Sequence, residues 1–148
     1  MTLAEQSALQ AALSWLERAD RSEPELRNYL ERKGFGAAET AEALEKCRGY
    51  GYLDDEALAN RVQSAMKRGL AGDLKILDRL EKRGLDAEVE SSDAVQRALL
   101  ALGRRFNGQE SSADPKVWAR AARHLAGKGY REEEICRALE MYFPGCEF

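Results

Sequence analysis

The 148-residue sequence has few prolines, aromatic residues and cysteines: 3 prolines, 7% aromatics and 3 cysteines. β-Branched residues are also scarce, which argues against a large β-sheet. The cysteines Cys47, Cys136 and Cys146 are odd in number and widely separated, which suits a reducing cytoplasm better than a disulfide framework. No run of about 18 apolar residues is present, so the sequence predicts no membrane span. The first residues also lack the basic and apolar regions of a secretion leader, and we expect a cytoplasmic protein.

Helix-forming residues are abundant. Hydrophobic residues make up 44% of the chain and charged residues 33%, and Ala, Leu, Glu and Arg are the commonest types. These are strong helix formers, and the hydrophobic content is too high for a disordered chain. A chain of this length also buries enough surface to form an ordinary core. The composition therefore predicts an all-α protein.

Charge is unevenly distributed along the chain. The 23 basic and 26 acidic side chains leave a net charge of −3, which gives no overall attraction for nucleic acid. Residues 61–83, however, carry seven basic side chains against three acidic ones, and residues 97–131 carry eight against two. Residues 1–60 are acidic, with seven basic and twelve acidic side chains. We therefore expect basic surfaces on the two positive segments.

A short motif occurs three times, at residues 30–35, 80–85 and 125–130. In each copy a leucine stands four residues before a glycine, a basic residue directly before it and a large apolar residue directly after it. Glycine readily adopts the left-handed conformation that ends many helices, and basic side chains favour the negative end of the helix dipole. The motif predicts three helices that end at Gly34, Gly84 and Gly129.

The spacing of the motif predicts internal repeats. Between the predicted ends, the apolar periodicity indicates about nine helices in total. We expect an elongated tandem array of three three-helix repeats, with boundaries at 1–50, 51–96 and 97–148. Such an array is also compatible with a generic helical scaffold that has no binding activity.

Several segments together resemble one known family. They are Cys-Arg-Gly-Tyr-Gly-Tyr-Leu-Asp-Asp-Glu at 47–56, the Ser-x-x-x-Leu pattern within 22–30, the glycine-bracketed turn at 68–76, and residues 104–106 with 125–130. Over nearly the whole chain, from about Leu9 to Phe143, this combination resembles the RecX family of recombinase regulators. One departure concerns the turn, where the family's Gly-x-Gly-Pro gains a residue and has Asp73 in place of proline. We expect Asp73 to cap the following helix instead.

The resemblance implies a non-enzymatic regulator. Members of this family bind the filament of the RecA recombinase on single-stranded DNA, lie in its groove, and inhibit its ATPase, coprotease and strand-exchange activities. The resemblance therefore implies a role in DNA repair, recombination and the SOS response, without a cofactor. It also implies a monomer that makes at most weak direct contact with DNA.

Basic side chains recur at helical spacing in both positive segments. Around the helix that ends at Gly84, basic residues occupy one face and apolar residues the other. We expect the binding residues to be Arg61, Lys67, Arg68, Lys75, Arg79, Lys82, Arg83, Arg104, Arg105, Lys116, Arg120 and Arg123. Such a surface can dock on an acidic protein surface or on phosphates, although a solvated face explains any single residue equally well.

A direct DNA-binding protein of tandem three-helix units is the alternative. Against it, no helix concentrates polar base-reading residues with basic flanks.

Catalytic and metal-binding patterns are absent from the sequence. There is no nucleophile elbow, phosphate-binding glycine loop or zinc-protease helix motif. His124 is the only histidine, and we expect it at the surface or at a helix end. Asp54 and Asp55 precede a predicted helix and are interpreted as caps. The cysteines lack the close pairs that structural zinc uses. We therefore expect neither an enzyme nor a bound metal.

Overall fold

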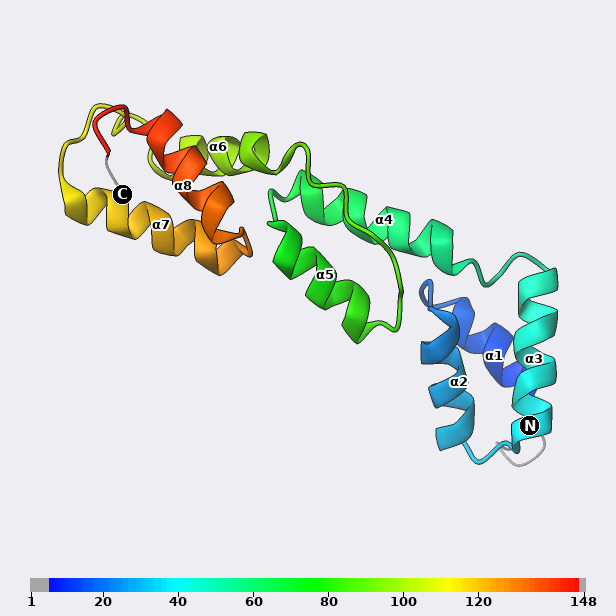
Figure 1. Ribbon diagram of the computed structural model, residues 1–148. Coiled ribbons are helices and arrows are strands. Elements are labelled where there is room, and N and C mark those ends of the chain that lie inside the picture. The colour runs from blue at the N-terminus through cyan, green and yellow to red at the C-terminus, as the bar shows by residue number, and fades with distance from the viewer. Residues whose placement is uncertain (1–5, 147–148) are drawn as a thin grey trace. The chain divides into compact units, whose positions relative to one another are not determined.

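The computed structural model describes residues 6–146 of the chain. Within this range all regular structure is α-helical, which confirms the predicted class (Figure 1). The helices are α1 (Ala8–Leu16), α2 (Glu23–Arg32), α3 (Ala37–Gly49), α4 (Asp55–Arg68), α5 (Asp73–Lys82), α6 (Ala94–Arg105), α7 (Pro115–Lys128) and α8 (Glu132–Tyr142). The described residues thus hold eight helices, one fewer than the nine expected.

The segment between α5 and α6 is extended where a further helix would be needed. Residues 85–91 have no helical structure. Two of their carbonyls, those of Glu88 and Glu90, instead accept hydrogen bonds from the side chains of Gln63 (3.0 Å) and Lys67 (2.7 Å) of α4. Backbone groups need partners, and here a neighbouring helix supplies partners that an internal helix would otherwise provide.

The chain divides into two compact units. The first comprises the residues up to Arg61 together with Leu80–Ala87, and the second comprises Val62–Arg79 and the residues from Glu88 onward. Helices α4 and α5 therefore contribute residues to both units. None of the helices in residues 6–146 is both long enough and apolar enough to span a bilayer.

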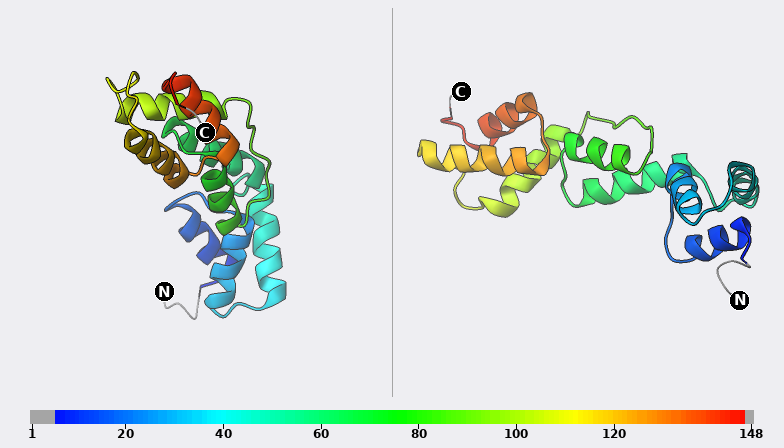
Figure 2. Two further views of the ribbon diagram at one scale, coloured as in Figure 1. Left: turned by 60° about the vertical axis from the view of Figure 1, so that its left-hand side comes forward. Right: turned by 90° about the horizontal axis from the view of Figure 1, so that it is seen from below.

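In the first unit, α1, α2 and α3 lie next to one another (Figure 2). They pack around one hydrophobic cluster. Burial of apolar surface is the main stabilising contribution here. The cluster contains Ala8, Ala11, Ala12, Leu26, Leu30, Ala43, Leu44, Cys47 and Leu53. At its edge the rings of Trp15 and Tyr29 stack with centroids 4.1 Å apart, and the Arg21 guanidinium lies over the Trp15 ring at 4.2 Å.

In the second unit, α6, α7 and α8 enclose a separate hydrophobic cluster. Its fully buried members include Leu102 of α6, Leu125 of α7 and Leu139 of α8, together with Phe143 just after α8. Phe106 at the end of α6 packs edge-on against Phe143, with ring centroids 6.4 Å apart. Each unit therefore has a core of its own.

Several helices begin with local capping motifs. Ser7 and Ser22 form capping boxes with Gln10 and Glu25, in which each side chain bonds the backbone N–H of the other residue. Asp54 accepts a hydrogen bond from the backbone N–H three residues later, at 3.1 Å, which confirms its predicted role as a cap. Such side chains supply acceptors for the N–H groups that a helix start leaves free.

All three predicted helix ends are confirmed. Gly34, Gly84 and Gly129 have φ angles of 94°, 71° and 95°, in the left-handed region. In each case the backbone N–H after the glycine donates to the carbonyl of the leucine four residues before it, over 2.8–3.2 Å. This is the hydrogen bond of the glycine C-cap that the motif predicts.

Two of these glycine ends also dock onto the start of an earlier helix. In the second unit, the N–H of Gly72 donates to the carbonyl of Lys128 (2.8 Å), and that of Leu74 donates to the carbonyl of Gly129 (3.0 Å). A Cβ on Gly129 would lie only 2.5 Å from the Cβ of Lys75. The end of α7 therefore lies against the start of α5, and only glycine fits there.

A similar contact is found in the first unit. A Cβ on Gly84 would lie 2.7 Å from the Cβ of Pro24. The buried hydroxyl of Ser22 donates a hydrogen bond to the carbonyl of Arg83. The end of α5 thus lies against the start of α2, much as the end of α7 lies against the start of α5.

Asp73 has a different role from the predicted helix cap. It is the first residue of α5, and Gly72 occupies the cap position before it. Its side chain is fully buried and accepts a hydrogen bond from Arg97 of α6, which is itself only 5% exposed. A second cation, Arg131, lies 3.6 Å from the other carboxylate oxygen. The cap prediction was wrong because this carboxylate binds distant cations instead of local N–H groups.

Candidate anion-binding surfaces

Arg83, one of the predicted binding residues, is held within the first unit. Its guanidinium donates to the carboxylate of Glu25 at 3.0 Å and to the carbonyl of Asp20 at 2.9 Å. Burial alone would raise the pKa of Glu25, but the bonds from Arg83 and from the Ser22 N–H outweigh it and hold that pKa below its ordinary value. The structure therefore gives Arg83 an intramolecular partner, so it is not a free cation on the surface.

Arg61 and Lys67 of α4 also have acidic partners. Arg61 lies 3.2 Å from Asp20, with both side chains well exposed. The ammonium group of Lys67 lies 3.4 Å from Asp93 and also bonds the extended segment after α5. Lys67 therefore makes stabilising contacts within the protein, whereas the Arg61–Asp20 pair is screened by solvent and contributes little energy.

The two faces of α5 differ as the sequence predicts. Ile76 and Leu80 are buried, while Lys75, Arg79 and Lys82 are exposed. Lys75 and Arg79 belong to the second unit, and neither forms an ion pair with any residue in 6–146. We call these two residues the α5 stripe. Arg68 is exposed at the end of α4.

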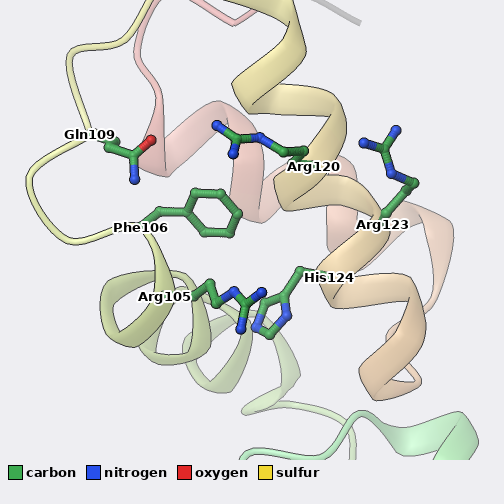
Figure 3. A pocket seen from close by; sticks show the side chains of 6 residues that line it. All are labelled: Arg105, Phe106, Gln109, Arg120, Arg123 and His124. Carbon is green, nitrogen blue, oxygen red and sulfur yellow. The ribbon is translucent and has the colours of Figure 1, made fainter.

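A hollow of about 350 Å³ lies between the end of α6, the loop after it and one face of α7. Its lining residues are Arg105, Phe106, Gln109, Arg120, Arg123 and His124, which we call the basic hollow (Figure 3). In the figure Arg120 extends toward the loop that carries Gln109, and Arg105 lies beside His124. Three of the predicted binding residues are thus brought together, although Arg105 is far in sequence from the other two.

His124 lies within this positive environment. Burial lowers the pKa of its imidazole, and the nearby charges of Lys128 and Arg105 lower it further. Its ring packs edge-on against Phe106, with centroids 6.1 Å apart. The expected surface or helix-end position is only partly right, since the side chain is half-buried and lines the hollow.

The sequence analysis missed Gln109 and His124 as members of this site. For His124 a pattern was available, because it stands four residues after Arg120 and so shares a helix face with it. For Gln109 there was none, since it lies in a loop. The predicted residues Arg104 and Lys116 are exposed but do not line the hollow.

The chemistry of these surfaces is that of anion binding. Guanidinium and ammonium groups bind carboxylates and phosphates, and guanidinium does so through two parallel hydrogen bonds. Within residues 6–146 no group of three or more His, Cys, Asp or Glu side chains is placed to hold a metal ion. Cys47 and Cys146 are buried free thiols, and burial raises the pKa of each.

Comparison with known proteins identifies the family. The family model described as "RecX, first three-helix domain" matches residues 8–47, which span α1, α2 and most of α3. A protein of Acidithiobacillus ferrooxidans named regulatory protein RecX is 32% identical over 129 residues, which cover 86% of this chain and 85% of the relative. The chain belongs to the RecX family. Another RecX relative, from Trichlorobacter lovleyi, is 30% identical over 141 residues and covers 88% of this chain and 92% of its own length.

A solved RecX structure supports the fold. The crystal structure of RecX from Lactobacillus salivarius matches with a TM-score of 0.75 over 95% of this chain and 96% of that one. Its sequence is only 20% identical, so the likeness concerns the fold alone. Together these matches establish an all-helical member of a family of regulatory proteins.

Proposed function

We propose that this chain regulates the RecA recombinase by binding its filament on single-stranded DNA. Bound there as a monomer in the cytoplasm, without a cofactor, it inhibits the ATPase, coprotease and strand-exchange activities of the filament during DNA repair and recombination and in the SOS response. The observation that carries this proposal is membership of the RecX family over 86% of the chain.

The exposed cations that have no acidic partner support a binding function rather than a catalytic one. The α5 stripe and the basic hollow present side chains that can dock on acidic protein surface or on phosphates. Such contacts increase the rate of association and weaken with added salt. We assign filament binding to Arg68, the α5 stripe and the basic hollow, and we exclude Arg83 because Glu25 holds it within the first unit.

We also infer that the chain consists of three related repeats, at 1–50, 51–96 and 97–148. Support comes from the glycine-capped ends of α2, α5 and α7, one in each segment. The docking of Gly84 and Gly129 onto the start of the preceding capped helix adds to it. A repeated contact of this kind is what a tandem array uses to join neighbouring units.

The direct test is RecA ATPase activity on single-stranded DNA with increasing amounts of this protein. We expect the rate to fall as the protein approaches stoichiometry with the recombinase. An unchanged ATPase rate at stoichiometric excess would contradict the proposed function.

A charge-reversal pair tests the α5 stripe separately. We expect Lys75→Glu/Arg79→Glu to lose at least tenfold in inhibitory potency, because two attractive contacts become repulsive. The control is Arg18→Glu/Arg137→Glu, which changes the net charge equally at exposed positions outside both surfaces. Circular dichroism checks that both variants fold. Full inhibition by the folded α5 variant would refute the role of the stripe while leaving the regulatory function intact.

A further inference from the structure

An apolar groove of about 450 Å³ lies in the first unit, between the end of α1 and the turn that follows α3. Its lining residues are Leu13, Leu16, Glu17, Tyr50 and Tyr52, which we call the tyrosine groove. Both tyrosines are 58% exposed, and the described residues contain only three other exposed large hydrophobic side chains. Apolar side chains that gather in one hollow, rather than lie scattered singly, are typical of an interaction site.

The backbone holds both tyrosine rings at the surface. Gly51 between them has a φ of 81°, and the N–H of Tyr52 donates to the carbonyl of Cys47 at 2.9 Å. On either side of this turn Cys47 and Leu53 are buried. The two rings contact each other edge-on, with centroids 5.9 Å apart. Because the turn is anchored at both ends, a partner meets the rings already in place and loses little conformational entropy on binding.

Another aromatic pair of the first unit is covered, in contrast to the tyrosine groove. Trp15 and Tyr29 stack on each other, and the outer faces of the stack carry Arg21 at 4.2 Å and Lys33 at 5.2 Å from the ring centroids. Within residues 6–146, neither phenol hydroxyl of the groove forms a hydrogen bond. Tyrosine combines a large apolar area with few rotatable bonds, and it is among the residues that contribute most to binding at protein interfaces.

The charge beside the groove is negative. Glu17 is exposed and forms no ion pair with any residue in 6–146. It directly follows α1, whose last turn has no basic residue to offset the negative end of the helix dipole. Residues 1–60 as a whole carry twelve acidic side chains against seven basic ones. The complementary group is therefore a cation, which the faces of the aromatic rings also attract.

We propose that the tyrosine groove docks a protein segment in which an aliphatic side chain stands beside Lys or Arg. The aliphatic group packs on the leucines and the tyrosine rings, and the cation reaches Glu17. The inference rests on the proposed function, because it takes this segment to belong to the RecA subunits of the filament. A nucleic acid is disfavoured as the occupant, since bases stacked on the tyrosines would bring phosphates beside Glu17 in an acidic unit.

The first experiment measures binding to a RecA filament that is immobilised through its single-stranded DNA, by biolayer interferometry at 0.1 M and 0.5 M salt. The variant is Tyr50→Ser/Tyr52→Ser. The matched control is Leu100→Ser/Met141→Ser, which removes two similarly exposed apolar side chains from the second unit. We expect the groove variant to lose at least about tenfold in affinity at both salt concentrations, because apolar contacts are not screened, and the control to bind like wild type.

A conservative variant separates loss of the rings from damage to the fold. Tyr50→Phe/Tyr52→Phe keeps both rings and removes only the hydroxyls, so we expect it to bind like wild type, while circular dichroism checks that all variants fold. Binding of the phenylalanine pair as weak as that of the serine pair would contradict apolar docking. Unchanged binding by the serine pair would overturn this proposal alone, whereas absence of binding by the wild type would overturn the proposed function with it.

Glu17→Arg tests the cation of the docked segment. Its matched control is Glu45→Arg, at an exposed position of α3 outside the groove. We expect Glu17→Arg to weaken filament binding by about fivefold at 0.1 M salt, and by less at 0.5 M salt, because the exposed charge is screened. Equal affinities of the two arginine variants at 0.1 M salt would contradict a cation at Glu17.

Two measurements without the recombinase address the other occupants. We expect Tyr50→Ser/Tyr52→Ser to bind fluorescently labelled oligothymidylate as the wild type does, measured by anisotropy. Weaker binding by the variant would assign the tyrosines to nucleobases and would overturn the proposal. In sedimentation velocity we expect no change in oligomeric state between the two proteins. A concentration-dependent dimer of the wild type that the variant loses would assign the groove to a second copy of the chain and would likewise overturn it.

Discussion

Arg97 and Asp73 form a buried charge pair that joins α6 to the start of α5. Arg97 also bonds the carbonyl of Ala71, whereas the second carboxylate oxygen of Asp73 accepts no hydrogen bond and lies 3.6 Å from Arg131. Removal of one member of such a pair leaves the other charge buried without compensation. The pair is therefore more sensitive to single substitutions than its net contribution to stability would suggest.

We predict that Arg97→Ala lowers the free energy of unfolding by about 3–5 kcal/mol. The exposed Arg137→Ala should change it by less than about 0.5 kcal/mol. Urea denaturation followed by circular dichroism measures both. The double variant Asp73→Leu/Arg97→Met should recover much of the loss, because it removes both charges together. A loss in Arg97→Ala no larger than in Arg137→Ala would show that the pair is not buried in solution.

The Arg83–Glu25 pair predicts a dependence of stability on pH. The folded pKa of Glu25 lies below the ordinary value of 4.5, so folding favours the charged carboxylate. This contribution is present above pH 4.5 and is lost as the pH falls through the lower folded pKa. We expect Glu25→Gln to be less stable than wild type at pH 7 and to lose less stability than wild type between pH 5 and pH 3. Parallel losses in the two proteins would contradict this assignment, and thermal denaturation at each pH measures them.

At the scale of the elements, the glycines that end the helices have two different structural roles. Gly34 and Gly129 have nearly the same φ, 94° and 95°. A Cβ on Gly34 would meet nothing within 4 Å, whereas one on Gly129 would lie 2.5 Å from the Cβ and 2.7 Å from the backbone nitrogen of Lys75. Gly34 is therefore needed only for its left-handed backbone conformation, whereas Gly129 also permits α7 to pack closely against α5.

We predict that Gly34→Ala costs about 1–2 kcal/mol, the cost of a left-handed conformation for a residue with a side chain. Gly129→Ala should cost at least about 1 kcal/mol more, because the start of α5 must move away from the new methyl group. The difference between the two free energies of unfolding tests the docking contact, since the conformational cost is shared. Equal losses would show that α7 does not pack against α5 as described.

At the scale of the whole molecule, each compact unit has its own hydrophobic cluster and its own tryptophan. Trp15 packs against the cluster of the first unit, and Trp118 against that of the second. The Trp118 indole also donates a hydrogen bond to the carbonyl of Ser112, at 2.9 Å. Fluorescence of single-tryptophan variants can therefore report on each unit separately.

We predict that Arg97→Ala lowers the urea midpoint reported by Trp118 (in Trp15→Phe) more than the midpoint reported by Trp15 (in Trp118→Phe). The reason is that Arg97 and Asp73 both belong to the second unit. The same comparison with Arg83→Ala should give the opposite order, since Arg83 and Glu25 lie in the first unit. Identical shifts at both tryptophans in both variants would indicate a single cooperative transition instead.

The sequence alone determined the local features of this protein. These features are the helical class, the capped start at Asp54, the three glycine ends and the two faces of α5, and each depends on residues within one or two turns of each other. Hydrogen bonds and side-chain neighbours in a helix come from residues three or four positions apart, so the order of residues suffices to predict them. The basic character of segments 61–83 and 97–131 is likewise a property of the sequence.

Only the tertiary structure decided which of the charged residues remain open to a ligand. Arg83 and Arg97 meet carboxylates that are 58 and 24 residues away in the chain, and Lys67 bonds a segment 23 residues away. The same packing brings Arg105 of α6 beside α7 to form the basic hollow. The partner of a charged side chain can lie at any distance in the sequence, because it is whichever opposite charge the fold brings within a few ångströms. The sequence therefore predicts where the cations are, and the fold selects those that can bind.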